Sequence, residues 1–175
     1  AHCLGRTPAE TMSYLGADWL TRPERIVEEQ PEQMLAALHI RPGMVVADIG
    51  AGVGYHALRL AALVGPEGLV YATDLQPEML ALLRRSAAEK GARNVVATLS
   101  GDTTTGLPRG VIDLALMVDV YHELDQPERF LEALREALKP DGRLVLVEFR
   151  GEDPDVPIKV EHKMTAPQAI SELDR

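Results

Sequence analysis

The sequence predicts an α/β fold with an open, mostly parallel twisted sheet and helices on both faces. Two observations predict it. Five short apolar runs alternate with longer segments of helical spacing, which is the order of repeated βαβ units. The first run, which is uninterrupted and therefore suits a strand buried on both faces, leads directly into glycines at 50, 52 and 54.

Each expected element follows from its local pattern. Residues 1–40 are expected to be helical and irregular, because Pro8, Pro23 and Pro31 can each begin a short helix. From residue 44 onward, proline and glycine bound most of the helical segments. The expected strands are residues 44–49, 69–73, 95–99, 113–118 and 143–149, and the expected helices are residues 31–38, 55–64, 77–91, 126–139 and 165–173.

Composition narrows the function classes. The 175 residues suffice for one domain with a real core, organised as an N-terminal helical lid (1–40), a ligand-binding core (41–150) and a loop with the start of a last helix (151–175). A net charge of −9 disfavours a nucleic acid partner, and no apolar run is long enough for a transmembrane segment. The single cysteine, Cys3, excludes an intrachain disulfide. We expect a cytoplasmic protein, with an upstream signal peptide left open because the chain begins at Ala1.

The glycine-rich turn after the first strand predicts a cradle for a nucleotide-type ligand. Glycines let backbone approach a ligand without a Cβ clash, and the free amides of a helix that begins near Tyr55 suit a carboxylate or phosphate. The alternative is a tight strand-to-helix turn that binds nothing. The residues assigned to this cradle are Asp48, Gly50, Ala51, Gly52, Gly54 and Tyr55.

Acidic residues also follow the next strands, where ligands bind in an open parallel sheet. Asp74 can accept hydrogen bonds from ribose hydroxyls, with Leu75 beside it as an apolar face for a purine. Asp102, after Gly101, can accept from an exocyclic adenine amine. The alternatives are a helix cap for Asp74 and a turn residue for Asp102.

The end of the fourth strand carries the candidate catalytic residues. His122 is a candidate general base, and a structural histidine bonded to backbone is the equal alternative. Asp119 is expected to face the cofactor or the acceptor and is a second catalytic candidate. Tyr121 is a third catalytic candidate, and Tyr121 and Glu148 are also candidates for the pocket wall. His122, Glu123 and Asp125 lack the H-E-x-x-H spacing of a zinc site, so no metal is predicted.

Taken together, these residues resemble the class I S-adenosylmethionine (SAM)-dependent methyltransferases, which have a Rossmann-like fold. Asp48-Ile49-Gly50-Ala51-Gly52-Val53-Gly54 looks like their first motif, Asp74 matches their acidic residue after the second strand, and Gly101-Asp102 matches their adenine-side position. Asp119 falls at their fourth motif, and Leu138–Leu144 resembles their lead into the fifth strand. The resemblance covers about residues 31–150 and implies SAM as cofactor, with S-adenosylhomocysteine (SAH) as its product.

A closer similarity is to bacterial methyltransferases of the type 11 kind, whose flanking motifs resemble residues 17–25, 156–159 and 162–164. The sequence departs from the family in one respect. The family sheet has seven strands and ends in an antiparallel hairpin, whereas this chain stops after its fifth strand and the start of a helix. An unpaired fifth strand would be an open apolar edge, so we expect either a truncated chain or a homodimer formed through that edge.

The leading hypothesis is therefore methyl transfer from SAM to a small-molecule acceptor, with His122 or Asp119 taking a proton. One alternative is a catalytically idle SAM-binding or interaction module of the same fold. The other is an NAD-dependent oxidoreductase, whose dinucleotide-binding turn typically has the glycine spacing G-x-G-x-x-G. Here the third glycine comes one position early, at Gly54, and Asp48 has no role in that scheme.

Overall fold

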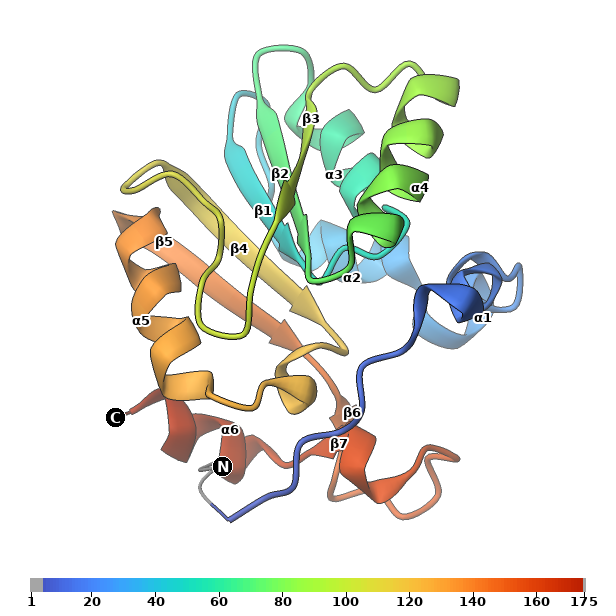
Figure 1. Cartoon of the computed structure of the whole chain (residues 1–175), viewed down its shortest axis with the longest axis vertical. Helices are drawn as coiled ribbons and strands as arrows, with labels where there is room; N and C mark the ends of the chain where they lie inside the picture. Colours follow the sequence, from blue (N-terminus) through green and yellow to red (C-terminus); the bar gives the residue numbers. More distant parts are fainter. Residues whose placement is uncertain (1–4, 175) are drawn as a thin grey trace.

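The computed structural model describes residues 5–174, and its main sheet has five parallel strands in the order β3-β2-β1-β4-β5 (Figure 1). The chain runs outward from β1 to β3 and then returns to the other side of β1 for β4, so the strand order reverses between β1 and β4. Ligands of open α/β sheets bind at that reversal, beyond the carboxyl ends of the strands. The predicted fold class is confirmed. The strands are β1 (Val45–Ile49), β2 (Leu69–Asp74), β3 (Val95–Leu99), β4 (Ile112–Val118) and β5 (Leu138–Val147).

Helices cover both faces of this sheet (Figure 1). In β4, Leu114 and Leu116 pack into the core cluster beneath α3 and α4, whereas Ala115 and Met117 pack into the cluster beneath α5. Because alternate side chains enter two different cores, β4 is continuously apolar from Leu114 to Val118 rather than alternating with polar residues. The helices are α1 (Arg25–Glu29), α2 (Pro31–Ala37), α3 (Ala57–Val64), α4 (Pro77–Glu89), α5 (Pro127–Ala137) and α6 (Ala166–Leu173).

The junction of α5 and β5 differs from the prediction. Residues 126–139 were expected as helix and 143–149 as strand, but α5 ends at Ala137 and β5 spans Leu138–Val147. Leu138 already pairs with Ile112, and the register then shifts so that Arg143 pairs with Leu114. A bulge at 140–142 absorbs the extra residues. A Cβ on Gly142 would lie 2.7 Å from the Ile112 carbonyl oxygen, so glycine permits this close approach.

The N-terminal region is helical from residue 14 but not before. A 3-10 helix spans Tyr14–Thr21, and α1 and α2 follow it. Pro8 begins no helix, contrary to expectation, because the segment around it is extended and the Ala9 amide donates to the His122 carbonyl at 3.1 Å. This segment crosses the lower part of the molecule and rises to the N-terminal helices (Figure 1).

The C-terminal region adds a feature that the sequence analysis missed. Two short strands, β6 (Phe149–Arg150) and β7 (Lys163–Met164), form a separate parallel pair, with the 3-10 helix Val160–His162 directly before β7. Within residues 5–174, no antiparallel hairpin extends the main sheet, and β5 lies at its edge. Dimerisation through that edge stays a prediction. No helix in this part of the chain is long and apolar enough to cross a membrane.

Candidate functional site

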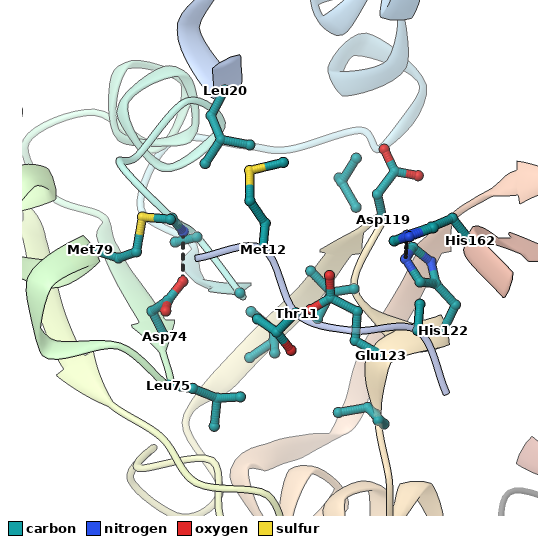
Figure 2. A pocket seen from close by; sticks show the side chains of 18 of the residues that line it. Thr11, Met12, Leu20, Asp74, Leu75, Met79, Asp119, His122, Glu123 and His162 are labelled. Atoms are coloured by element: carbon teal, nitrogen blue, oxygen red, sulfur yellow. Dashed lines mark hydrogen bonds between the residues drawn. The ribbon is translucent and has the colours of Figure 1, made fainter. Parts of the chain in front are cut away.

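A cavity of about 730 Å³ opens beyond the carboxyl ends of β1, β2 and β4. Four parts of the chain supply most of its lining: the extended segment 8–12, the N-terminal helices between residues 19 and 29, the loops at the strand ends, and the segment 157–162. Figure 2 shows Asp74, Leu75 and Met79 on one side of it and Asp119, His122 and His162 on the other. Such a volume accommodates a drug-sized ligand. The predicted strand-end residues therefore meet in one place, as parallel topology requires.

The glycine-rich turn forms the floor of the cavity. Gly50, Gly52 and Gly54 have φ of 66°, 54° and 92°, a backbone region that favours glycine. A Cβ on Gly50 would lie 2.5 Å from a Val120 methyl group. Gly54 is a turn residue rather than a cavity residue: it is absent from the lining, and a Cβ there would point at Leu83, at 3.2 Å.

Asp74 ties this turn to the end of β2. Its carboxylate accepts from the Gly52 amide and from the Gln76 amide, each at 2.9 Å. The side chain lines the cavity, and burial raises its pKa against the opposing effect of these amide donors. The cavity wall continues with Leu75, which is 40% exposed, and with Gly101 and Asp102. A carboxylate held in this way keeps lone pairs for a ligand.

Asp48 carries an unsatisfied buried oxygen. The residue is 2% exposed, and its Oδ2 has no hydrogen-bond partner within the described chain. Burial raises the pKa of Asp48 to about 7, although the Ala57 amide and the charge of Arg25 oppose the shift. A buried polar atom without a partner costs about 1–3 kcal/mol. The free oxygen of Asp48 can therefore accept from a cationic or hydrogen-donating group in the cavity that Asp48 lines.

A cluster of side chains beneath the N-terminal helices closes the end of the cavity that contains Asp48 and Tyr55. The sequence analysis did not predict this cluster. The Arg25 guanidinium lies 4.0 Å from the ring centroid of Tyr55, donates to the Leu20 carbonyl at 2.8 Å and pairs with Glu29. His56 lies beside it, and burial followed by the charge of Arg25 lowers the pKa of His56 to about 3. A buried arginine has no sequence signature, so only the packing shows it.

The opposite end is acidic and contains two histidines. His122 Nδ1 lies 2.5 Å from Glu148 Oε2, and His122 Nε2 lies 3.2 Å from His162 Nδ1. Burial raises the pKa of Asp119 to about 7, with the Glu148 charge adding to it, and burial likewise raises the pKa of Glu123 to about 7. Asp119 has a φ of 54°, a strained conformation for a residue with a Cβ. Perturbed acids in a cavity are typical of functional sites.

Comparison with known proteins fits this geometry. The family model described as "Methyltransferase domain" matches residues 47–146, more than half of the chain. The crystal structure of a SAM-dependent methyltransferase from Aquifex aeolicus superimposes with a TM-score of 0.88 and 29% identity, over 94% of this chain and 87% of that one. The chain belongs to the class I SAM-dependent methyltransferases.

Curated relatives of this methyltransferase-domain chain differ in what they act on. A protein-L-isoaspartate O-methyltransferase of Methanothrix thermoacetophila is 38% identical over 114 residues, 65% of this chain and 51% of the relative. A ubiquinone/menaquinone biosynthesis C-methyltransferase of Cupriavidus metallidurans is 30% identical over 115 residues, 66% of this chain and 47% of the relative. The chain thus spans about half the length of these relatives. The family match supports SAM chemistry rather than the NAD-dependent alternative.

The residues present fit SAM, the cofactor of this family. The unsatisfied Asp48 oxygen suits the ammonium of the methionine portion, and the Asp74 carboxylate suits ribose hydroxyls. Leu75 offers an apolar face to a purine. The acidic character of the cavity also favours the sulfonium charge. In each case an acceptor oxygen of the protein is matched with a hydrogen-bond donor of SAM, or an apolar side chain with its purine.

Tyr121 requires a correction, because it does not line the cavity. Its ring is fully buried, and its hydroxyl donates to Glu172 at 2.9 Å. Only its backbone amide belongs to the site, since that amide donates to Glu148 Oε1 at 2.8 Å. Tyr121 therefore supports the site from below and cannot act as an acid or base in it. No group of three or more metal-ligand side chains occurs among the described residues.

The titration of Asp119 gives a test of its environment. Its folded pKa of about 7 lies above its ordinary value of 3.8, so the folded state holds the proton more tightly than the unfolded state. This contribution to stability is present below the ordinary pKa and is lost as pH rises through about 7. Relative to an Asp119→Asn variant, the wild type is expected to lose free energy of unfolding between pH 4 and 7 in urea titrations. Parallel pH curves for the two proteins would contradict this environment.

Proposed function

We propose that this protein transfers a methyl group from SAM to a small-molecule acceptor. The observation that carries the proposal is the roof over the cavity. The segment 8–12 crosses it, and the segment 157–162 flanks it, which supports a small acceptor over an extended protein segment. A volume of about 730 Å³ suits a cofactor with a small acceptor beside it.

The roof is held at both of its ends. On one side, Gln76 donates through Nε2 to the Met12 carbonyl at 2.8 Å and accepts from the Tyr14 amide at 2.9 Å. On the other side, Arg6 donates to the His122 carbonyl at 2.9 Å. Between them, the Thr11 side chain hydrogen-bonds to Glu123. Figure 2 shows Thr11 and Met12 between the two sides of the cavity. We infer that this lid excludes water during transfer.

The cofactor is proposed to lie along the β1–β2 side. Its methionine end would contact Asp48, Gly50, Ala51 and Gly52, with Tyr55 nearby, and its ribose would contact Asp74. Its adenine would lie near Leu75, Gly101 and Asp102. The remaining volume, bounded by Asp119 and His122, is the acceptor region. When bound, SAM supplies an electrophilic methyl group, and the chain contributes position and a place for the acceptor's proton.

Calorimetry and product detection test this function together. SAM and SAH are titrated into the full chain, with NADH as a comparison ligand, and SAH release is then followed with phenols, amines and an isoaspartyl peptide as acceptors. We expect binding of SAM and SAH only, and turnover with a small acceptor. Binding without turnover of any acceptor would favour the idle-module alternative, and failure to bind SAM would exclude the proposal.

A further inference from the structure

The acceptor region holds a chain of three side chains that the function above does not yet use. Glu148, His122 and His162 come from three separate parts of the sequence and are linked by contacts of 2.5 Å and 3.2 Å. The side chains of His122 and Glu148 are 3% and 8% exposed, so they form the buried end. His162 is the outer member, and both histidines line the cavity.

The hydrogen bonds set which nitrogen is free. A carboxylate can only accept, so His122 Nδ1 carries a proton toward Glu148. In its neutral form, which is the form that can take up a proton, His122 accepts at Nε2 from His162 Nδ1, and this leaves Nε2 of His162 as a lone pair without a partner in this chain of contacts. This is the arrangement in which a carboxylate orients one imidazole and that imidazole orients the next.

The surroundings favour movement of a proton inward. The Glu148 hydrogen bond and charge raise the pKa of His122 against the effect of burial, with Glu123 and Asp119 adding to the increase. Burial, together with the positive charge that His122 carries once it is protonated, lowers the pKa of His162, with Lys159 contributing and Glu161 and Glu148 opposing. His162 is therefore neutral near pH 7, and a proton that reaches it is more stable on His122.

We propose that His162 is the catalytic base of the transfer, that His122 and Glu148 position it and take up its proton, and that the acceptor is a phenol rather than a carboxylate. This inference rests on the proposed function. A carboxylate acceptor is already ionised and needs no base. It would also meet a lining in which eight carboxyl groups face three cationic side chains among the described residues: Glu10, Glu29, Asp48, Asp74, Asp102, Asp119, Glu123 and Asp125 against Arg22, Arg25 and Lys159.

The apolar lining supports an aromatic acceptor. Phe130, Phe149 and Ile158 line the same cavity as the two histidines. A flat ring can pack against such side chains while its hydroxyl reaches His162, because aromatic groups combine an apolar body with one polar atom. An aliphatic polyol would leave these surfaces without a matching partner.

The phenol O–H bond breaks, and its proton goes to His162 Nε2 as the oxygen forms a bond to the methyl carbon. The electron pair of the methyl–sulfur bond stays on sulfur, which becomes a neutral thioether. His162 Nδ1 passes its proton to His122 Nε2, and the resulting imidazolium lies against the Glu148 carboxylate. The proton returns to solvent when the products leave.

The decisive experiment compares phenols of different acidity at one pH. With phenol itself, whose pKa is about 10, His162→Gln is expected to lower kcat about 100-fold, the range of a general base. With a nitrophenol that is already ionised at the assay pH of 8, the same variant is expected to lose less than about 3-fold, since no proton remains to be removed. His39→Asn, a histidine that does not line this cavity, is the matched control and should equal the wild type with both acceptors.

Two further measurements separate this inference from a structural role. NMR of histidine labelled with ¹⁵N should show His162 protonated at Nδ1 and bare at Nε2, and Glu148→Gln should lower the pKa of His122. SAH affinity should be unchanged in His162→Gln. Two outcomes would overturn the inference without affecting the proposed SAM binding. One is an equal loss of kcat with both phenols in His162→Gln, and the other is methyl transfer to the isoaspartyl peptide but to no phenol. A wild type that does not bind SAM would overturn the proposed function as well.

Discussion

Replacing Asp74 with alanine is expected to weaken SAH binding about 100-fold. A carboxylate that accepts from ribose hydroxyls makes charge-assisted hydrogen bonds of about 1.5–3 kcal/mol each, and about 3 kcal/mol corresponds to two decades in affinity. The same carboxylate also holds the Gly52 amide at 2.9 Å, so its loss loosens the turn that would cradle the methionine end. Isothermal titration of the full chain measures the effect directly.

Two controls make the Asp74 result interpretable. Glu67→Ala removes an exposed carboxylate outside the cavity and should leave affinity unchanged. Asp102→Ala removes an exposed carboxylate that lines it and should cost about 10-fold or less, because a single hydrogen bond to an exposed group is worth about 1 kcal/mol. A folded Asp74→Ala protein that binds SAH as tightly as the wild type would disprove the ribose assignment.

Replacing Arg6 with methionine is expected to lower the free energy of unfolding by about 3 kcal/mol. Arg6 Nε lies 2.9 Å from Glu172 Oε1, and the Glu172 side chain is 1% exposed. Arg6 also donates to the carbonyls of His122 and Tyr121. Removing one member of a buried ion pair leaves the other as a buried charge, which costs about 3–5 kcal/mol. The lower end applies because Tyr121 and Gln168 still donate to Glu172. Urea unfolding of both proteins measures the difference.

A surface pair supplies the comparison. Arg109 and Glu136 are 3.5 Å apart, with side chains 79% and 58% exposed, and Arg109→Met should cost less than about 1 kcal/mol. The double variant Arg6→Met/Glu172→Gln should lose less than the sum of the single variants, because neither partner is left charged and unpaired. Additive losses would show that the pair is not coupled.

The Arg6 variant should also change the response to acid. Burial by itself raises the pKa of Glu172, but hydrogen bonds from Arg6, Gln168 and Tyr121 outweigh it and leave the pKa below its ordinary 4.5. The stability from this group is thus present above pH 4.5 and is lost as pH falls through the lowered folded pKa. Without Arg6, that acid-dependent loss should shrink. This pair joins the start of the described chain to α6 and holds one end of the lid.

The cavity residues that we assign to the cofactor were predictable as a group because their determinants are local. Asp48 and the glycines lie within one strand-turn-helix unit, and Asp74 follows the neighbouring strand by a rule of parallel topology. Leu75, Gly101 and Asp102 line the cavity for the same reason. Gly54 shows the limit of pattern reading: its positive φ was foreseeable, but its packing against Leu83 was not.

His122 and Asp119 were predicted as candidates on the proposed acceptor side, but their contacts were not, because those contacts join residues far apart in the chain. His122 and His162 are 40 residues apart and meet through the short strand pair β6–β7, which has no sequence signature. Tyr121 is adjacent to His122, yet its side chain enters the opposite core and bonds to Glu172. The side chain of His122 therefore lines the cavity and that of Tyr121 does not, and no local sequence pattern distinguishes the two residues.

By itself, then, the sequence determined the α/β class, the alternation of strands with helices and the glycine-rich turn after the first strand, because hydrophobic periodicity and turn chemistry act over a few residues. Only the tertiary structure decided how the cradle is roofed and which polar groups face the acceptor. Those outcomes depend on the Arg6–Glu172 pair and the His162–His122–Glu148 chain. Such contacts are set by the packing of distant segments, and burial changes the protonation of their members in ways that composition cannot show.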